Sequence, residues 1–386
     1  MPGGVPVDLR AMDSSLPAAR EPGLDLLRAA AIVTVMLYHI ASHGFDLPRI
    51  GRHGWIGVDL FFVLSGYLIG WQVLGRIAAG AHADWGTFWL RRALRVLPAY
   101  WTVLAVYLAV PAWREAETMA PPWQFLTFTV NLFPDYARFR AYSHAWSLCV
   151  EEHFYLLFPL AAGVLTRRPG KARTIAAFVL LAAGGMLMRD GLWRHEVAPM
   201  LAAGDAAGAF LRHAETIYAP TWTHLDGLLA GVLLATVRAF RPAWWAALLR
   251  RAPLLLALGL ATVALAVRID PVGRVGTLLL YPLLGLGFGC LLVAAVSPRL
   301  PFARVALPGA RPLALLAFSL YLTHRQVYAW LDALLVHLVG SAPWTAFAIA
   351  NLAALAVAGL LYLAVERPGL LLRDRLLRRR TAVQAG

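Results

Sequence analysis

Ten long apolar stretches constrain the fold of this chain more than any other feature of its sequence. They cover residues 24–41, 57–75, 96–110, 145–165, 174–188, 222–237, 253–267, 277–296, 312–331 and 343–365. A helix that rises 1.5 Å per residue crosses the roughly 30 Å hydrocarbon core of a bilayer in about 20 residues. The sequence therefore predicts an all-α integral membrane protein, a bundle of about ten transmembrane helices. A further apolar segment, 121–133, is too short to span, and we expect it to be interfacial or re-entrant.

The composition agrees with a membrane protein. Of the 386 residues, 60% are hydrophobic and 15% are charged, whereas soluble domains are about half apolar and a quarter charged. Lysine and arginine number 35 against 21 acidic residues, which gives a net charge of +14. A soluble nucleic-acid-binding protein would present such charge on a solvated basic face, which this chain hardly possesses, so we expect no nucleic-acid partner.

The distribution of basic residues predicts the orientation. With the N-terminus inside, the predicted cytoplasmic segments hold 23 of the 35 basic residues and the outside segments hold 10, while Arg28 and Arg325 fall within spans. This bias follows the positive-inside rule and indicates a multi-pass protein of the inner (plasma) membrane with both termini cytoplasmic. We expect a cytoplasmic tail over residues 1–23, a transmembrane domain over 24–368 and a basic cytoplasmic tail over 369–386.

Arg28 and His39 on the first span are the first candidate functional pair. Eleven residues at 100° each return to within about 20° of the starting direction, so the two side chains share one helix face about 16 Å apart. Such a pair suits an anionic carrier at the cytoplasmic end and proton chemistry at the outer end. A snorkelling arginine and a hydrogen-bonded core histidine explain the spacing equally well.

Three further residues lie near the ends of the next two spans. Asp59 lies level with His39 at the outer end of the second span, where it either orients the imidazole or complements the helix dipole. Arg92 and Arg95, at i and i+3, face the same way before the third span. The two arginines either grip a phosphate together or anchor the topology at anionic lipid.

A polar seam marks the fourth span, because Ser147, Glu151 and Tyr155 recur at steps of four residues. A carboxylate is hard to explain on a lipid-facing surface, so the seam is expected to face the bundle interior. Four later polar residues support either interhelical hydrogen bonding or chemistry: Asp226, Tyr321, His324 and Glu366. The histidine spacing matches no metal motif, so no metal is expected.

Seven motifs together resemble one family. They are Arg28-x10-His39, Gly57-Val58-Asp59-Leu60-Phe61-Phe62-Val63-Leu64-Ser65-Gly66-Tyr67, Arg92-x-x-Arg95, Trp146-Ser147-Leu148-x-x-Glu151-x-x-Phe154-Tyr155, His224-Leu225-Asp226, Ser319-Leu320-Tyr321-x-x-His324 and Glu366-Arg367-Pro368. Their order and positions resemble the acyltransferase-3 family of integral membrane O-acyltransferases, and the resemblance runs from Leu24 to Pro368. Two residues depart from the family pattern: His153 stands where glutamine is common, and His224 stands where an arginine often precedes the aspartate.

The resemblance implies an acyltransferase reaction (EC 2.3.1.-). Its donor is expected to be cytosolic acyl-CoA, most commonly acetyl-CoA, with Arg28, Arg92 and Arg95 gripping the phosphates. Its acceptor is expected to be a hydroxyl of a carbohydrate or glycosylated molecule. His39 is the expected catalytic histidine. Because the sequence ends at Gly386 without an esterase-like domain, we expect the membrane domain to complete transfer alone or with a separate extracytoplasmic partner.

These expectations combine into one mechanism with one rival. Neutral His39 acts as general base toward the acceptor hydroxyl, and Asp59 or Glu151 fixes its tautomer. The rival is a proton- or substrate-coupled transporter or flippase, in which the same buried ionisable groups form a path.

Overall fold

The computed structural model describes residues 21–385 except 44, 46–50, 52, 82–83 and 168–169, and it describes side chains as far as residue 378. The predicted N-terminal tail up to residue 20 lies outside the described residues. The same holds for five arginines of the charge count: Arg10, Arg20, Arg49, Arg52 and Arg168.

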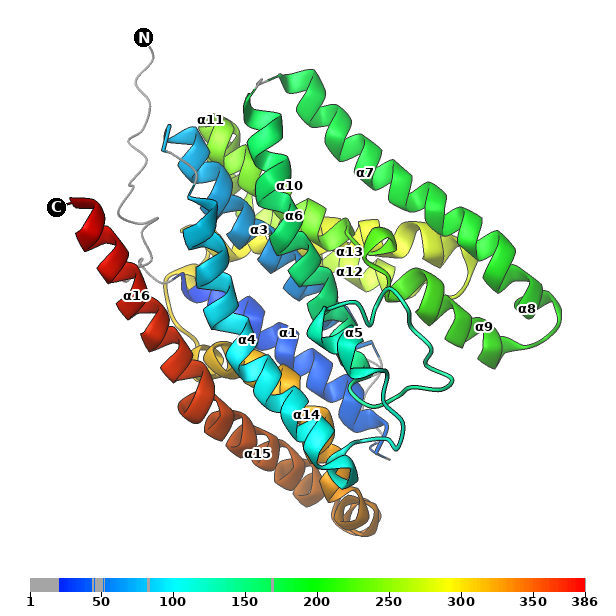
Figure 1. Cartoon of the computed structure of the whole chain (residues 1–386). Helices are drawn as coiled ribbons and strands as arrows, with labels where there is room; N and C mark the ends of the chain where they lie inside the picture. Colours follow the sequence, from blue (N-terminus) through cyan, green and yellow to red (C-terminus); the bar gives the residue numbers. More distant parts are fainter. Residues whose placement is uncertain are drawn as a thin grey trace.

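The described chain is a bundle of helices and contains no β-strand (Figure 1). Each of the ten predicted stretches coincides with a helix. These helices are α1 (Pro22–Ala41), α3 (Ile56–Ala78), α4 (Trp85–Ala109), α6 (Trp146–Arg167), α7 (Lys171–Leu192), α10 (Asp226–Phe240), α12 (Ala252–Ala266), α13 (Arg274–Val296), α14 (Ala310–Val339) and α15 (Pro343–Leu361). The remaining helices are α5 (Pro122–Leu126), α8 (Ala198–Ala202), α9 (Ala206–His213), α11 (Pro242–Arg250) and α16 (Arg367–Ala385).

Six helical segments of the described chain are long and apolar enough to cross a membrane. There are seven if α10 and α11, which meet at 116°, form one broken span. Among the others, α12 has only 15 residues, and α4 carries Arg91, Arg92 and Arg95 within its first half. The all-helical membrane bundle is thus confirmed, while ten spans and cytoplasmic termini stay predictions. The apolar segment 121–133 holds only the five-residue α5 and turns, in keeping with the prediction that it does not span.

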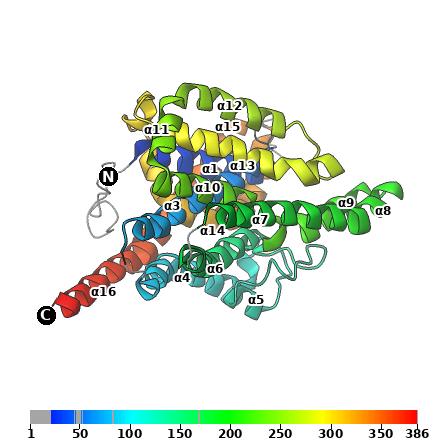
Figure 2. The same cartoon turned by 90° about the horizontal axis from the view of Figure 1, so that it is seen from above.

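The centre of the bundle is formed by α3 and α10, between α12 and α13 on one side and α4 and α6 on the other (Figure 2). Close packing of α3 on α10 depends on glycine. A Cβ atom at Gly66 would lie 2.2 Å from the backbone oxygen of Leu228, and one at Gly231 would lie 2.2 Å from that of Val63. The small residues at this crossing therefore let two backbones approach more closely than any side chain allows.

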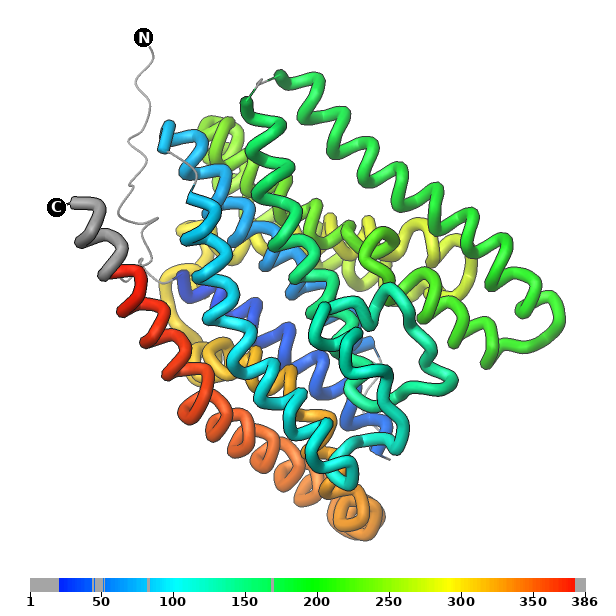
Figure 3. The backbone as a smooth tube through the Cα atoms, viewed as in Figure 1, coloured from blue at the N-terminus to red at the C-terminus, as the bar shows by residue number. Residues whose placement is uncertain are grey.

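The outer helices present apolar side chains that the protein does not cover. Leu180 and Leu187 on α7 are 71% and 73% exposed. A helix of this length with uncovered leucines is suited to contact with lipid. Beyond α7 the chain continues through α8 and returns as α9, so the segment between the predicted spans 174–188 and 222–237 is largely helical (Figure 1). The tube in Figure 3 shows that α15 also runs on into α16, past the expected domain boundary at residue 368.

Candidate active site

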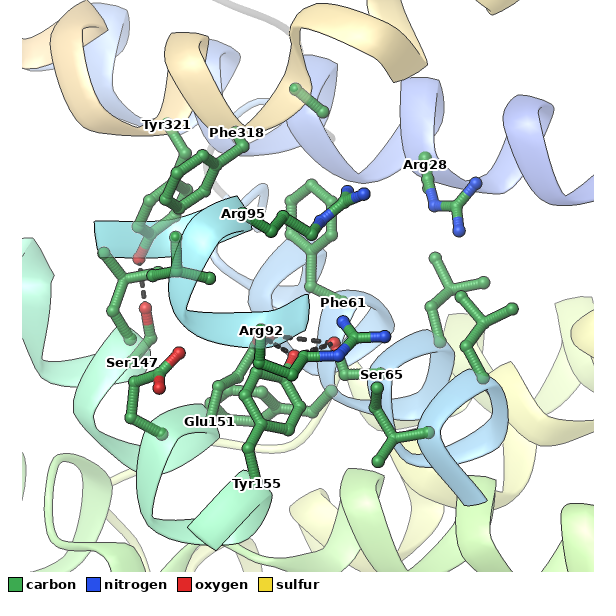
Figure 4. Close-up of a pocket in the computed structure, with 18 of the residues that line it drawn as sticks. Arg28, Phe61, Ser65, Arg92, Arg95, Ser147, Glu151, Tyr155, Phe318 and Tyr321 are labelled. Carbon is green, nitrogen blue, oxygen red and sulfur yellow. Dashed lines mark hydrogen bonds between the residues drawn. The ribbon is translucent and has the colours of Figure 1, made fainter. Parts of the chain in front are cut away.

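A cavity of about 340 Å³ opens between α1, α3, α4, α6 and α14. Its volume falls within the range of small-molecule sites. Seven of the predicted site residues line it: Arg28, Arg92, Arg95, Ser147, Glu151, Tyr155 and Tyr321. Figure 4 shows Arg28 at one end of the cavity, Ser147 with Tyr321 at the other, and Arg92 and Arg95 between them.

The three cavity arginines differ in their contacts. Arg28 pairs with Asp25 one turn earlier on α1, with 3.3 Å between Nη1 and Oδ1. Arg92 donates from Nη2 to Gln72 at 3.1 Å, and its guanidinium lies 5.4 Å from the ring centre of Tyr155. Arg95 is exposed and, within the described part of the chain, makes no hydrogen bond or ion pair. Arg95 is therefore the cavity cation best placed to meet an anionic ligand.

The Glu151 carboxylate joins α6 to α3 at the cavity wall. The Tyr155 hydroxyl donates to Oε2 at 2.5 Å, and the Ser65 hydroxyl donates to Oε1 at 3.0 Å. Two hydroxyl donors satisfy the carboxylate without a salt bridge. In the sequence, Ser65 belongs to the motif at residues 57–67. Its spacing from Glu151 gives no indication that the two side chains are in contact.

A second hydroxyl pair lies at the far end of the cavity. Ser147 Oγ lies 2.5 Å from Tyr321 Oη, and the Tyr321 hydroxyl donates to the backbone oxygen of His144 at 3.0 Å. The Phe61 ring packs edge-on against Tyr321 at 6.4 Å between centres. Both rings line this end of the cavity, and Tyr321 is one turn of α14 before His324.

Glu152 also lines the cavity, although the helical angle of the polar seam gave no reason to expect it there. Two adjacent carboxylates thus face a space that contains three arginines. The cavity combines both signs of charge, which suits a ligand that carries an anionic end and an amide- or hydroxyl-bearing end.

His39 is not among the residues that line the cavity, and it contacts another histidine. Its Nδ1 is 2.8 Å from Nε2 of His324, and the ring centres are 4.9 Å apart. On its other side, Nδ1 of His324 lies 2.7 Å from the backbone oxygen of Leu320. His324 is one turn of α14 past Tyr321, whose ring centre is 6.1 Å away. His39 and His324 were both candidates, but their pairing was not predicted.

Asp59 does not orient His39. It is buried, and its Oδ1 lies 3.0 Å from Nε2 of His224, whose Nδ1 is 2.6 Å from the backbone oxygen of Tyr218. Glu151 is held by Ser65 and Tyr155 instead. The prediction that one of these two acids fixes the His39 tautomer is therefore wrong. The prediction relied on the similar depth of Asp59 and His39 in the membrane. The Asp59 side chain instead points to His224, just before the start of α10.

Asp226 and Glu366 hold helices together away from the cavity. Asp226 accepts from the buried Arg189 of α7 at 2.5 and 3.2 Å. Glu366 Oε2 accepts from the Ser319 hydroxyl of α14 at 2.8 Å. Both contacts join neighbouring helices. They fit the interhelical hydrogen bonding that the sequence analysis gave as one of two alternatives for these residues. Arg189 follows the last residue of the predicted span 174–188, and its pairing with Asp226 was not predicted.

Comparison with known proteins shows the family to which the chain belongs. Residues 21–363 match the family model of an acyltransferase domain, Acyl_transf_3. The chain belongs to this acyltransferase family. The acyltransferase domain thus accounts for nearly the whole described bundle, from the start of α1 to the end of α15.

Two similar relatives of this acyltransferase domain are bacterial O-acetyltransferases. The O-acetyltransferase OatA of Staphylococcus aureus is 30% identical over 229 residues, which cover 56% of this chain and 34% of OatA. The putative peptidoglycan O-acetyltransferase YrhL of Bacillus subtilis is 30% identical over 187 residues, or 45% of this chain and 28% of YrhL. The matched part of the chain spans about a third or less of each relative. No solved structure matches the chain significantly.

Proposed function

We propose that this protein is a membrane-bound O-acyltransferase that moves an acetyl group from acetyl-CoA to a hydroxyl of an envelope carbohydrate. The observation that carries the proposal is the cavity, in which Arg28 lies at one end and Arg92 and Arg95 lie between it and Tyr321. Tyr321 is one turn of α14 before His324, which contacts His39. The family membership and the two named O-acetyltransferases support the class of reaction.

The donor is proposed to bind with its phosphates at the arginine end. Guanidinium groups make bidentate, charge-assisted hydrogen bonds to phosphate oxygens, and Arg95 has its donors available for them. A pantetheine arm has amides and a hydroxyl, which match the Glu151 and Glu152 carboxylates and the Ser147 hydroxyl farther along the cavity. The thioester of the donor would then approach Tyr321 at the end of the cavity opposite Arg28.

The chemical step is proposed to take place at His39, about 16 Å along α1 from Arg28. The neutral imidazole accepts the proton of the acceptor hydroxyl as that oxygen attacks the thioester carbonyl carbon. A carbon–oxygen bond forms, the carbon–sulfur bond breaks, and the CoA thiolate leaves and recovers the proton from the imidazolium. Tyr321 lines the cavity, and its ring centre lies 6.1 Å from that of His324, the partner of His39, so the acyl group is proposed to pass this ring during turnover.

The acceptor is proposed to be a glycan of the cell envelope, such as peptidoglycan. The name of YrhL refers to peptidoglycan, and a base in the last turn of α1, at the outer end of the predicted first span, suits an acceptor on the outside of the predicted topology. The membrane assigned to this topology is the inner (plasma) membrane.

The test is turnover by the purified protein in detergent with acetyl-labelled acetyl-CoA and glycan strands. The proposal predicts that free CoA thiol and label on the glycan appear together and only when both substrates are present. A transporter would leave acetyl-CoA intact and the glycan unlabelled, and that result would overturn the proposal. Mass spectra of envelope glycans from cells with and without the gene would identify the natural acceptor.

A further inference from the structure

In the hydrogen bond between His39 of α1 and His324 of α14, the other partners of His324 determine which ring donates. His324 is fully buried, and its two ring nitrogens contact the Leu320 backbone oxygen and the His39 ring. A carbonyl oxygen can only accept, so Nδ1 of His324 must carry the hydrogen and donate it. A neutral imidazole has a single N–H, which leaves Nε2 of His324 as a lone pair that can only accept.

The protonated form of His324 does not fit its surroundings. The rings nearest to it belong to His39, His144, Tyr321 and Tyr328, and none of these groups is an anion. The nearby Glu115 carboxylate lies 3.8 Å from Arg325 and 3.9 Å from His144, and the ring nitrogens of His324 contact the Leu320 oxygen and His39 instead. A buried imidazolium without an anionic partner would carry a large desolvation cost.

We infer that His324 is a positioning residue, which holds His39 in the tautomer with hydrogen on Nδ1 and so leaves the lone pair on Nε2 for base catalysis. The inference rests on the proposed function for its catalytic meaning. Because Nε2 of His324 accepts, Nδ1 of His39 has to donate across their 2.8 Å contact. His324, itself held by the Leu320 oxygen, thus takes the role that the carboxylate has in a hydrolase triad, where it accepts the Nδ1–H of the catalytic histidine.

The same contact assists the imidazolium that forms during the reaction. When Nε2 of His39 takes the hydroxyl proton, its Nδ1–H donates from a positively charged ring, and the bond to His324 becomes charge-assisted. The proton then passes from Nε2 to the leaving CoA thiolate, and His39 returns to its starting tautomer. His324 keeps its own proton on Nδ1 throughout, bonded to the Leu320 oxygen.

The tautomer is tested directly by NMR on protein whose 11 histidines carry ring ¹⁵N, independently of turnover. The His39 signals are assigned by their loss in His39→Gln. We expect the wild type to show a protonated Nδ1 and an unprotonated Nε2 on His39. We expect the same pattern in His324→Gln, whose side-chain oxygen can take over as acceptor, and a mixture of tautomers in His324→Leu. A wild-type His39 protonated on Nε2 would overturn the inference.

Turnover gives the second readout. His324→Leu should lower kcat by about 10- to 100-fold, by analogy with the loss of a group that orients a metal-bound histidine, with KM for acetyl-CoA unchanged. His324→Gln should restore most of kcat. Gln326→Leu, a buried polar-to-apolar change two residues along α14, is the matched control and should leave kcat unchanged.

The outcomes separate the inference from the proposed function. If His324→Gln is as impaired as His324→Leu, or if His324→Leu keeps full kcat, the positioning role is wrong. If the wild type shows the expected tautomer but transfers no acetyl group, the proposed function fails while the assignment of the histidine pair stands.

Discussion

Replacing Arg95 with alanine tests the donor site most selectively. Arg95 is exposed at the cavity and has no hydrogen bond or ion pair among the described residues, so its loss breaks no direct contact of this kind and weakens only its longer-range attraction to Glu151 and Glu366. Arg92, in contrast, bonds Gln72 and stacks on Tyr155, and its removal would also disturb the cavity wall. A change in Arg95→Ala can thus be assigned to the ligand.

The expected change in KM follows from the energy of a hydrogen bond between the Arg95 guanidinium and a phosphate of the donor. A hydrogen bond to a charged group contributes about 1.5–3 kcal/mol, and solvent screening at an exposed site reduces this toward the lower limit. Since 1.4 kcal/mol corresponds to a factor of ten, KM for acetyl-CoA should rise about tenfold. With the phosphates held less well and His39 untouched, kcat should stay within about twofold at saturation.

The assay compares acetyl-CoA with acetyl-pantetheine, which lacks the nucleotide and its phosphates. Arg95→Ala should raise KM for the first donor and leave KM for the second unchanged. Arg173→Ala is the matched control, because Arg173 is an exposed arginine whose Nη2 donates to the backbone oxygen of Leu165 in the predicted cytoplasmic loop. An unchanged KM for acetyl-CoA, or an equal rise for both donors, would refute the phosphate contact.

Three further predictions concern stability in detergent. Gly66→Ala should lower the free energy of unfolding by about 1–3 kcal/mol through overpacking against α10, while Gly184→Ala on α7, where a Cβ atom has no neighbour within 4 Å, should not; equal effects would contradict the close crossing. Asp226→Ala should cost about 3–5 kcal/mol by leaving buried Arg189 unpaired, as followed by thermal unfolding, and a negligible loss would argue against the ion pair. Burial in α9 lowers the pKa of His213 from 6.5 to about 4, so stability should fall as pH drops from 6.5 toward 4, where the unfolded chain binds a proton that the buried ring does not. His213→Gln should flatten that slope, and an unchanged slope would assign it to another group.

The helices and the cavity wall were predictable because both follow from helical periodicity. Apolar length marked ten of the helices, and steps of three and four residues placed Arg92 with Arg95 and Ser147 with Glu151 on common faces. Those faces line the cavity in the structure. Angles along a single helix are local properties, so one sequence suffices to obtain them.

The pairings between helices could not be predicted in the same way. Asp59 and His39 have matching depths, but depth does not say toward which neighbour a side chain turns, and Asp59 turns to His224. Arg189 finds Asp226 because α7 packs beside α10, and His39 finds His324 because α1 packs beside α14. These neighbours depend on how the bundle closes, which no spacing within one segment encodes.

The measurement that tests the central proposal most directly is acetyl transfer by His39→Ala. The purified variant is compared with the wild type for acceptor-dependent release of CoA from acetyl-CoA, and CoA binding is measured on the same samples. General-base catalysis is worth about 10²- to 10⁴-fold, so turnover should fall by at least two orders of magnitude while CoA still binds. Turnover at the wild-type rate in His39→Ala would contradict the assignment of His39 as the base.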